Sequence, residues 1–192
     1  MNLKKNLNIA SILPYKENYT YDRASAASLW VSEFLKNSKY KNNNIIYGHT
    51  KSKDYLSKNY KNINLKNLKS KLKSTTSEYA EKLIKEIKNN NFDLVEVHNR
   101  PLLLFKLNNE VESKFIFYFH NDPLSMKGSK SVKERLKLLE IVEKIIFVSE
   151  WVRERFFLNI DQKLKTKTEI VYPSVNRQKK IKKEKYITFV GR

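Results

Sequence analysis

The 192-residue chain contains no cysteine, and this absence removes several kinds of chemistry at once. Disulfide frameworks, thiolate metal sites and cysteine nucleophiles are excluded together, and the composition fits a reducing compartment. Long apolar runs are also missing, because no stretch approaches the about 18 apolar residues that a membrane-spanning helix needs. The first residues show no small-residue cleavage site. We therefore expect a cytoplasmic protein with no leader to remove.

Glycine is scarce, with three residues in the whole chain. Neither a G-x-G-x-x-G nor a P-loop pattern occurs, so a Rossmann dinucleotide site and a P-loop are not expected. No G-x-S-x-G elbow surrounds Ser149, which follows an apolar run and is expected to cap a helix. The chemistry must therefore come from His, Asp, Glu, Ser, Tyr and basic side chains.

Acidic residues are few relative to basic ones, at 20 against 39, which gives a formal net charge of +19. Such an excess favours anionic partners such as nucleic acid, anionic lipid or phosphorylated substrates. Most of the excess is lysine, accompanied by many Asn and Ile residues, as a coding sequence rich in adenine and thymine would also produce. The charge alone leaves a functional partner and a coding bias as alternatives.

Short apolar runs rich in Ile, Val and Phe alternate with stretches that have helical periodicity. This alternation predicts an α/β fold, a doubly wound, Rossmann-like and mostly parallel sheet. The expected strands are residues 7–13, 44–47, 93–97, 115–119, 145–148 and 169–172. The expected helices are residues 23–37, 78–88, 132–142 and 151–158, with another that begins at Pro101.

All three histidines follow predicted strands, namely His49, His98 and His120. Ligands of doubly wound sheets bind beyond the carboxyl ends of the strands. A histidine that packs in a core or on a helix face has no reason to recur at that edge. We therefore expect at least one of the three to be functional.

The loop FHNDP, residues 119–123, concentrates the most chemistry. His120 can donate, accept or titrate near neutral pH, and Asp122 could orient His120 or a substrate hydroxyl. The alternative is an Asx-type turn, in which Asn121 and Asp122 only bind backbone amides. The residue types alone do not separate these two interpretations.

The loop VHNRP, residues 97–101, places His98, Asn99 and Arg100 at the same predicted edge. Arg100 could hold a phosphate or carboxylate through two hydrogen bonds, or it could be an ordinary surface arginine. His98, His120 and Asp122 could together form a metal site, but they lack the local spacing of metal-binding motifs, so this signal is weak.

The turn into the first helix carries the small residues Ala24, Ser25 and Ala26, preceded by Arg23. Small side chains would let a ligand approach the helix N-terminus, where free amides favour anions, and Arg23 adds a positive charge. We therefore include Arg23, Ala24 and Ser25 among the expected substrate-binding residues.

Residues 51–73 contain eight lysines and a single acid, Asp54. Leu65, Leu68 and Leu72 follow at spacings of three and four, so a helix here would have an apolar stripe flanked by lysines. That form is typical of a helix lying on an anionic membrane surface. The alternative is a solvated helix or loop whose leucines pack on the domain.

The order of several segments then resembles a known family. VEVHN, IFYFHNDP, IIFVSEWVRERF, IVYPSVN and ITFVGR, read in sequence, resemble the N-terminal domain and interdomain junction of family 4 GT-B glycosyltransferases, over residues 7–192. The resemblance implies transfer of a sugar, with retention, from a nucleotide-diphosphate sugar to an acceptor held by the N-terminal domain. It implies no metal and no other cofactor.

The resemblance assigns roles to particular residues. His120 is similar to the catalytic histidine that approaches the donor sugar, and His98 to the strand-end histidine of the preceding unit. Arg192 matches an arginine that binds the donor phosphates. The loop at Ala24 and Ser25 corresponds to a glycine-rich loop but lacks its glycines. The full set of substrate-binding residues expected is Arg23, Ala24, Ser25, His98, Asn99, Arg100, Asn121 and Asp122.

The resemblance also implies a domain organisation. Residues 1–176 would form the acceptor-side domain, and residues 177–192 a linker with the first strand of a truncated nucleotide-sugar-binding domain. Such a fragment is expected to be inactive alone, because the stabilisation of the leaving diphosphate is missing. The parent would be a hexosyltransferase of polysaccharide or lipopolysaccharide biosynthesis. It would act on a lipid-linked or polysaccharide acceptor at the inner face of the cytoplasmic membrane.

Three other classes remain as alternatives. A basic nucleic-acid-binding protein would use aromatics interleaved with the basic patch, such as Tyr55 and Tyr60, although no nucleic acid is expected as a partner. A non-catalytic stub, or a partner of a separately encoded C-terminal half, would have the same sequence. A metal-dependent hydrolase would use His98, His120 and Asp122.

Overall fold

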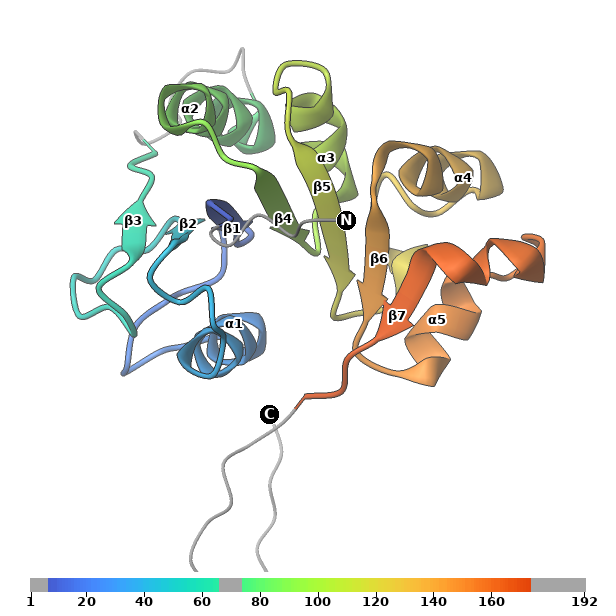
Figure 1. The fold of residues 1–192 in the computed structure, drawn as a ribbon, viewed down its shortest axis with the longest axis horizontal. Helices are drawn as coiled ribbons and strands as arrows, with labels where there is room; N and C mark the ends of the chain where they lie inside the picture. The colour runs from blue at the N-terminus through green and yellow to red at the C-terminus, as the bar shows by residue number, and fades with distance from the viewer. Residues whose placement is uncertain (1–6, 66–73, 174–192) are drawn as a thin grey trace, which may run out of the picture.

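The computed structural model describes residues 7–65 and 74–173, and within them seven strands form one parallel sheet. The strand order is β3-β2-β1-β4-β5-β6-β7 (Figure 1). The strands are β1 (Ile9–Ile12), β2 (Asn44–Gly48), β3 (Tyr60–Asn62), β4 (Leu94–His98), β5 (Lys114–Phe119), β6 (Lys144–Phe147) and β7 (Thr168–Ile170). All six predicted strands are present, and the predicted doubly wound, Rossmann-like fold class is confirmed.

The helices also lie close to their predicted positions. They are α1 (Ala26–Lys36), α2 (Thr75–Asn90), α3 (Pro101–Asn108), α4 (Val132–Ile141) and α5 (Glu150–Phe156), with 3₁₀ turns η1 (Pro123–Ser125) and η2 (Gln162–Lys167). Four of the helices are capped at their N-termini by a serine. In each case the serine hydroxyl accepts a hydrogen bond from the backbone amide three residues later, at Ser25, Ser74, Ser131 and Ser149. The predicted capping role of Ser149 is confirmed, and Pro101 occupies the first turn of α3.

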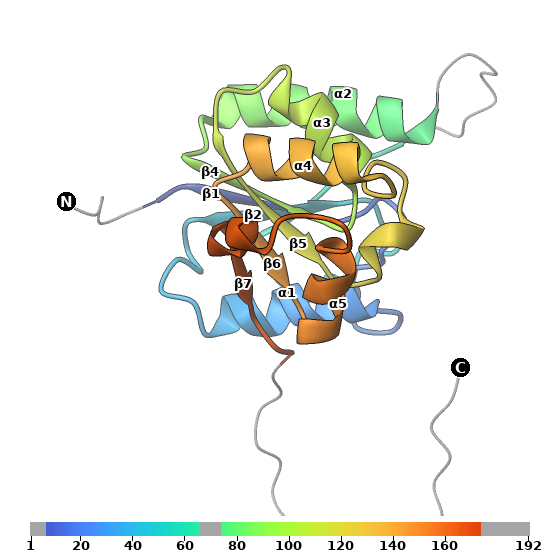
Figure 2. The same cartoon turned by 90° about the vertical axis from the view of Figure 1, so that its right-hand side faces the viewer.

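The two faces of the sheet are covered unequally. Helices α2, α3 and α4 lie across the sheet from α1 (Figures 1 and 2). Buried side chains of α2 to α5 join one large core, in which Phe119 of β5 and Phe147 of β6 contact Phe156 of α5. Helix α1 packs in a smaller cluster over β1 and β2, to which it contributes the buried side chains of Val31 and Leu35. This second face therefore leaves room for cavities beside α1.

The strand order reverses its direction between β1 and β4. Strands β2 and β3 lie on one side of β1, and β4 to β7 follow on the other side. Neighbouring loops leave opposite faces at such a switch point, which opens a crevice beyond the carboxyl ends of the two strands. The loops after β1, β4 and β5 are therefore the place to look for a site.

The leucine stripe predicted in the basic segment 51–73 lies largely outside the described residues. Of its three leucines only Leu65 is described, and it packs against the core. Earlier in the segment the chain forms the short strand β3 beside β2. Leu68 and Leu72 lie outside the described residues, as do Ser174 to Asn176, Arg192 and the rest of 177–192. The domain boundary at residue 176 thus stays a prediction.

No helix in residues 7–65 and 74–173 has the length and apolar character needed to cross a bilayer.

Candidate functional site

Asn99 joins the loops that follow β4 and β5. Its backbone has a φ of 52°, a left-handed conformation that asparagine adopts more readily than most residues. Its amide donates to the carbonyl of Tyr118 at 2.9 Å, and its side-chain Oδ1 accepts from the amide of His120 at 2.8 Å. The two predicted loops are therefore held together by one residue at the switch point.

His98 and His120 form a hydrogen-bonded pair of imidazoles. His98 Nδ1 lies 2.9 Å from His120 Nε2, and His98 is 1% exposed. The ring of Tyr118 stacks on His98 with centroids 4.5 Å apart. The edge of Trp30, from α1, contacts both imidazoles, at centroid distances of 5.9 and 5.2 Å. The structure thus brings the two predicted histidines together, with His98 buried behind His120.

Both imidazoles are uncharged at neutral pH. Burial lowers the pKa of His120 from 6.5 to about 4. Burial, with a smaller contribution from His120, holds the pKa of His98 well below its ordinary value. His98 Nε2 is buried without a partner among the described residues. Because partnerless buried N–H groups are rare, we infer that His98 Nδ1–H donates to His120 Nε2 and that His120 keeps its proton on Nδ1.

We expect the ring of His120 to remain neutral between about pH 8 and about pH 5 and to protonate only near about pH 4. Long-range ¹H–¹⁵N spectra of the histidine rings across this range would measure its midpoint, and His120→Gln would assign the signals. Because the folded-state pKa is lowered, the stability that the neutral ring contributes is complete above about pH 6.5 and is lost toward about pH 4. A titration midpoint of His120 near pH 6.5 would contradict the proposed lowering of its pKa by burial.

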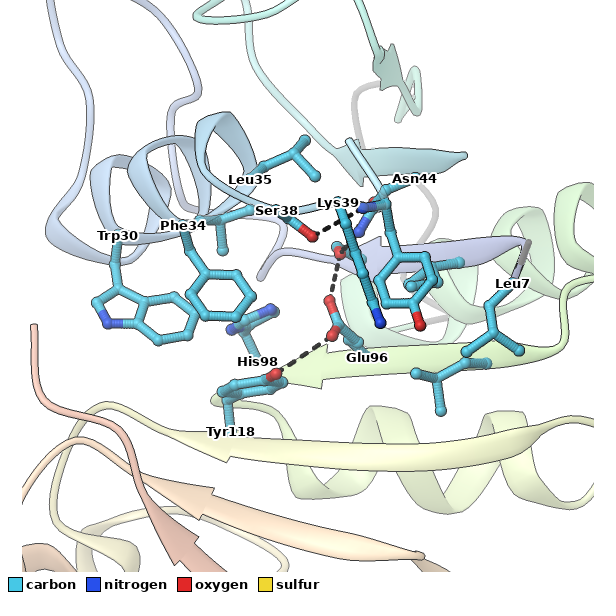
Figure 3. A pocket seen from close by; sticks show the side chains of 15 residues that line it. Leu7, Trp30, Phe34, Leu35, Ser38, Lys39, Asn44, Glu96, His98 and Tyr118 are labelled. Atoms are coloured by element: carbon cyan, nitrogen blue, oxygen red, sulfur yellow. Dashed lines mark hydrogen bonds between the residues drawn. The ribbon is translucent and has the colours of Figure 1, made fainter. Parts of the chain in front are cut away.

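Glu96 supports the pair from two residues earlier on the same face of β4. Its carboxylate accepts a hydrogen bond from the hydroxyl of Ser11 at 2.5 Å and another from Tyr118 at 3.2 Å. Figure 3 shows Glu96 bonded to Tyr118, with His98 and Trp30 beside them. Burial raises the pKa of Glu96, and its hydrogen bonds oppose that shift. Glu96 holds Tyr118, and Tyr118 stacks on His98, so this network fixes the imidazole pair from behind.

These groups line a cavity of about 310 Å³ between α1 and the sheet (Figure 3). Its walls are mainly apolar, with Trp30 and Phe34 of α1 on one side. Glu96 and Tyr118 were not among the site residues predicted from the sequence. The alternation in VEVHN was the available signal, because residues 96 and 98 of a strand must share one face.

A larger cleft, of about 480 Å³, lies at the carboxyl edge on the α1 side. It is called the histidine cleft below, and it is lined by His120, Asn99, Asn121, Ser25, Ala26 and Trp30, among others. The small residues at the start of α1 leave this space, as predicted. The hydroxyl of Ser25 accepts from the amide of Ser28 at 3.1 Å, so it caps the helix as well.

Arg23 and Ala24 do not line the histidine cleft. The side chain of Arg23 is 81% exposed and lies 3.6 Å from the carboxylate of Asp22, beside a separate small pocket with Thr50. Ala24 packs against the cluster under α1. Both residues belong to the loop between β1 and α1, in which Arg23 lies beside Thr20 and Thr50.

Asp122 takes part in an Asx-type turn, which was one of the two predicted interpretations of this residue. It accepts from the amide of Leu124 at 3.0 Å in an Asx-type turn, and it forms an ion pair with Arg155 of α5 at 3.0 Å. The bond to Arg155 lowers the pKa of Asp122. The ring of His120 thus bonds to His98 and not to Asp122, which had been the predicted partner. A role of Asp122 in substrate binding stays a prediction. In the described parts of the chain, no three His, Asp or Glu side chains gather as a metal site would require.

His49, the third histidine, also has a structural contact. Its Nδ1 lies 2.9 Å from the carbonyl of Ile63, which joins the end of β2 to the chain after β3. Of the three strand-end histidines, His98 and His120 thus belong to the site at the switch point, and His49 ties down the edge of the sheet.

Arg100 lines a second cleft at the same edge, on the opposite side of Asn99. This cleft measures about 420 Å³ and also contains Tyr15, Lys16, Asn121 and Lys127. Asn99 and Asn121 line both clefts, so the two are neighbours. Of the predicted residues, Asn99 and Asn121 form the wall that the two clefts share, Ser25 and His120 line the histidine cleft, and Arg100 lines the second cleft. His98 lies behind His120 and bonds to it.

No protein-family model and no curated protein matches the chain, but solved structures do. A glycosyltransferase from Rickettsia africae ESF-5 is similar over 90% of this chain and 44% of its own, at 16% identity and a TM-score of 0.58. Anabaena HepE, solved in complex with UDP-glucose, is similar over 89% of this chain and 45% of its own, at 10% identity and a TM-score of 0.60. A UDP-N-acetylglucosamine 2-epimerase is similar over 86% of this chain and 48% of its own, at 10% identity and a TM-score of 0.53.

These similarities establish a fold. The chain has the Rossmann-like, parallel architecture of one half of GT-B-like enzymes, and it spans a little under half the length of each of these structures.

Proposed function

We propose that the chain is the N-terminal, acceptor-side half of a GT-B glycosyltransferase. Residues 1–176 form the acceptor domain, and residues 177–192 begin the nucleotide-sugar-binding domain, where Arg192 binds the donor phosphates. The observation that supports this most is the neutral His120 in a cleft at the topological switch point, beside the N-terminus of α1. The fold shared with a glycosyltransferase and with a UDP-glucose complex agrees with it.

In this proposal His120 binds the transferred sugar. A neutral imidazole with its proton on Nδ1 donates a hydrogen bond to a sugar hydroxyl without placing a full positive charge beside the reacting carbon. The amides at the start of α1 offer partial positive charge, and Ala26 and Ala27 let the donor diphosphate come close. Transfer proceeds with retention of the anomeric configuration, as in family 4, and needs neither a metal nor another cofactor.

The parent enzyme is proposed to be a hexosyltransferase that acts on a lipid-linked or polysaccharide acceptor at the inner face of the cytoplasmic membrane. The exposed lysines Lys51, Lys53, Lys58 and Lys61 support attraction to anionic lipid. The nucleic-acid alternative loses support, because Tyr60 is buried and stacks on Tyr19, and Tyr55 packs against Tyr60. The ring of Tyr60 is therefore not free to stack on a base, and the ring of Tyr55 is half-buried.

The test is a transfer assay with the full-length gene product. A panel of UDP-, GDP-, ADP- and dTDP-sugars is incubated with lipid-linked and polysaccharide acceptors, and released nucleoside diphosphate and product anomers are measured. We expect release that depends on the acceptor and a product of retained configuration. Residues 1–192 alone should release none. Acceptor-independent release with an epimerised sugar would assign an epimerase instead, and no release from any donor would contradict the proposal.

A further inference from the structure

The cleft that contains Arg100 carries a local excess of positive charge. Lys16, Arg100 and Lys127 line it, and its described lining contains no carboxylate. The remaining polar lining is uncharged and includes Asn99, Asn121 and Ser125. We call it the cationic cleft.

Arg100 is held in place and still has donors to offer. Its guanidinium lies over the ring of Tyr15, 6.0 Å from the centroid, and its Nη1 donates to the carbonyl of Asn99 at 3.2 Å. No carboxylate within residues 7–65 and 74–173 forms an ion pair with it. A half-buried arginine whose planar guanidinium is held in place and has unused N–H groups is suited to bind a carboxylate or a phosphate.

Lys16 and Lys127 flank that guanidinium from two other loops. Lys16 follows β1 and lies 6.0 Å from the centroid of the same Tyr15 ring, and Lys127 follows η1. Three cations from the loops after β1, β4 and β5 therefore converge on one concave surface. Lysines that only solvate a surface have no reason to converge in this way.

The neighbouring histidine cleft has no such excess of positive charge. Its charged lining residues are Glu17 and Glu33, and Glu33 forms an ion pair with Lys36 of α1. An anionic group of an acceptor is therefore favoured more on the other side of Asn99. Because Asn99 and Asn121 belong to both linings, one ligand can extend across them from one cleft into the other.

We propose that the cationic cleft binds an anionic group of the acceptor, a phosphate or a carboxylate, and so directs an acceptor hydroxyl into the histidine cleft. This inference rests on the proposed glycosyl transfer and adds the substrate class to it. The anionic group comes from a phosphoryl-linked headgroup or from an acidic sugar. Arg100, Lys16 and Lys127 are specificity-determining residues, and none of them touches the transferred sugar.

The first test is binding by the chain itself. Methyl phosphate and glucuronate are titrated at constant ionic strength, and ¹H–¹⁵N spectra follow the side chain of Arg100 and the amides of Tyr15 and Lys127. We expect chemical shift changes that saturate with each probe. Arg100→Gln and Lys127→Gln should each lower the affinity for the probe by about 10-fold. Lys127→Gln, in an exposed loop, keeps the test valid if Arg100→Gln disturbs the fold. A stronger response to methyl phosphate indicates the phosphoryl source, and a stronger response to glucuronate the acidic sugar.

The matched control is Lys106→Gln, which removes an exposed lysine from the last turn of α3, outside the cleft lining. It should leave the affinity unchanged. No shift with either probe, or an equal loss in Lys106→Gln, would overturn the proposal even if the transfer assay succeeds. In the full-length enzyme, Lys127→Gln should raise the KM for an anionic acceptor about 10-fold and leave kcat and the KM for the donor unchanged. Probe binding without any transfer activity would instead refute the proposed function alone.

Discussion

Replacing His120 by alanine in the full-length enzyme is expected to lower kcat by about 100- to 1,000-fold and to change the affinity for the nucleotide sugar little. The ring is fixed before any substrate arrives, because His98 binds its Nε2, Asn99 binds its backbone amide and Trp30 packs on its edge. A hydrogen-bond donor that is held in this way stabilises the charge that develops during sugar transfer. It adds little to the binding of the substrate in its ground state. The assay is steady-state transfer, with the nucleotide affinity measured by calorimetry.

His49→Gln is the matched control for this loss. It replaces a histidine that also follows a strand of the same sheet, but whose Nδ1 contacts the carbonyl of Ile63 instead of a cleft. Its kcat should stay within about twofold of the parent, since removing a contact far from the reacting atoms leaves transition-state stabilisation intact. An unchanged kcat in His120→Ala would remove this histidine from the reacting centre.

Phe156→Ala is expected to destabilise the domain by about 3–5 kcal/mol. The Phe156 ring is fully buried and contacts three other aromatic rings, those of Phe119, Phe147 and Phe157, at centroid distances of 5.4, 5.4 and 5.3 Å. Removing it leaves a cavity that rigid neighbouring rings cannot fill, and it detaches α5 from β5 and β6. Urea denaturation followed by far-UV circular dichroism measures the free energy of unfolding.

Phe34→Ala provides the comparison, because the ring of Phe34 is 47% exposed and stacks mainly on Trp30. It should cost less than about 1.5 kcal/mol, in line with the smaller area that it removes from the core. Equal losses in the two variants would mean that the rings around Phe156 repack, and the description of a tightly packed aromatic cluster would have to be abandoned.

The architecture was accessible from the sequence because buried parallel strands are short, continuous apolar runs. Strand β3 escaped prediction for the same reason. It has three residues, it lies at the edge of the sheet, and only Tyr60 of its YKN sequence is buried. A lysine-rich segment with one buried tyrosine gives no periodic signal, and pairing with β2 decides its structure.

The site could be predicted only in part. The rule on strand ends selects His98 and His120 one by one, but their contact depends on β4 and β5 being neighbours, with His98 in register with Tyr118. The ion pair of Asp122 with Arg155 spans 33 positions and has no local pattern, so the residue types alone favoured a catalytic role as much as a turn. Arg23 was grouped with the helix N-terminus by its position in the sequence, and the path of its loop takes it elsewhere.

The position of β1 in the sheet has a consequence for synthesis on the ribosome. β1 precedes the other strands of this sheet in the chain, yet it lies in the interior of the sheet, and its two partners begin at Asn44 and Leu94. The second partner is translated about 50 residues after the first, which takes roughly 3–10 s at common elongation rates. During that interval the nascent chain carries a strand with one unpaired edge, and all four residues of this strand are buried in the folded domain. The opportunity for a chaperone, or for a wrong partner, is therefore longest before β4 emerges.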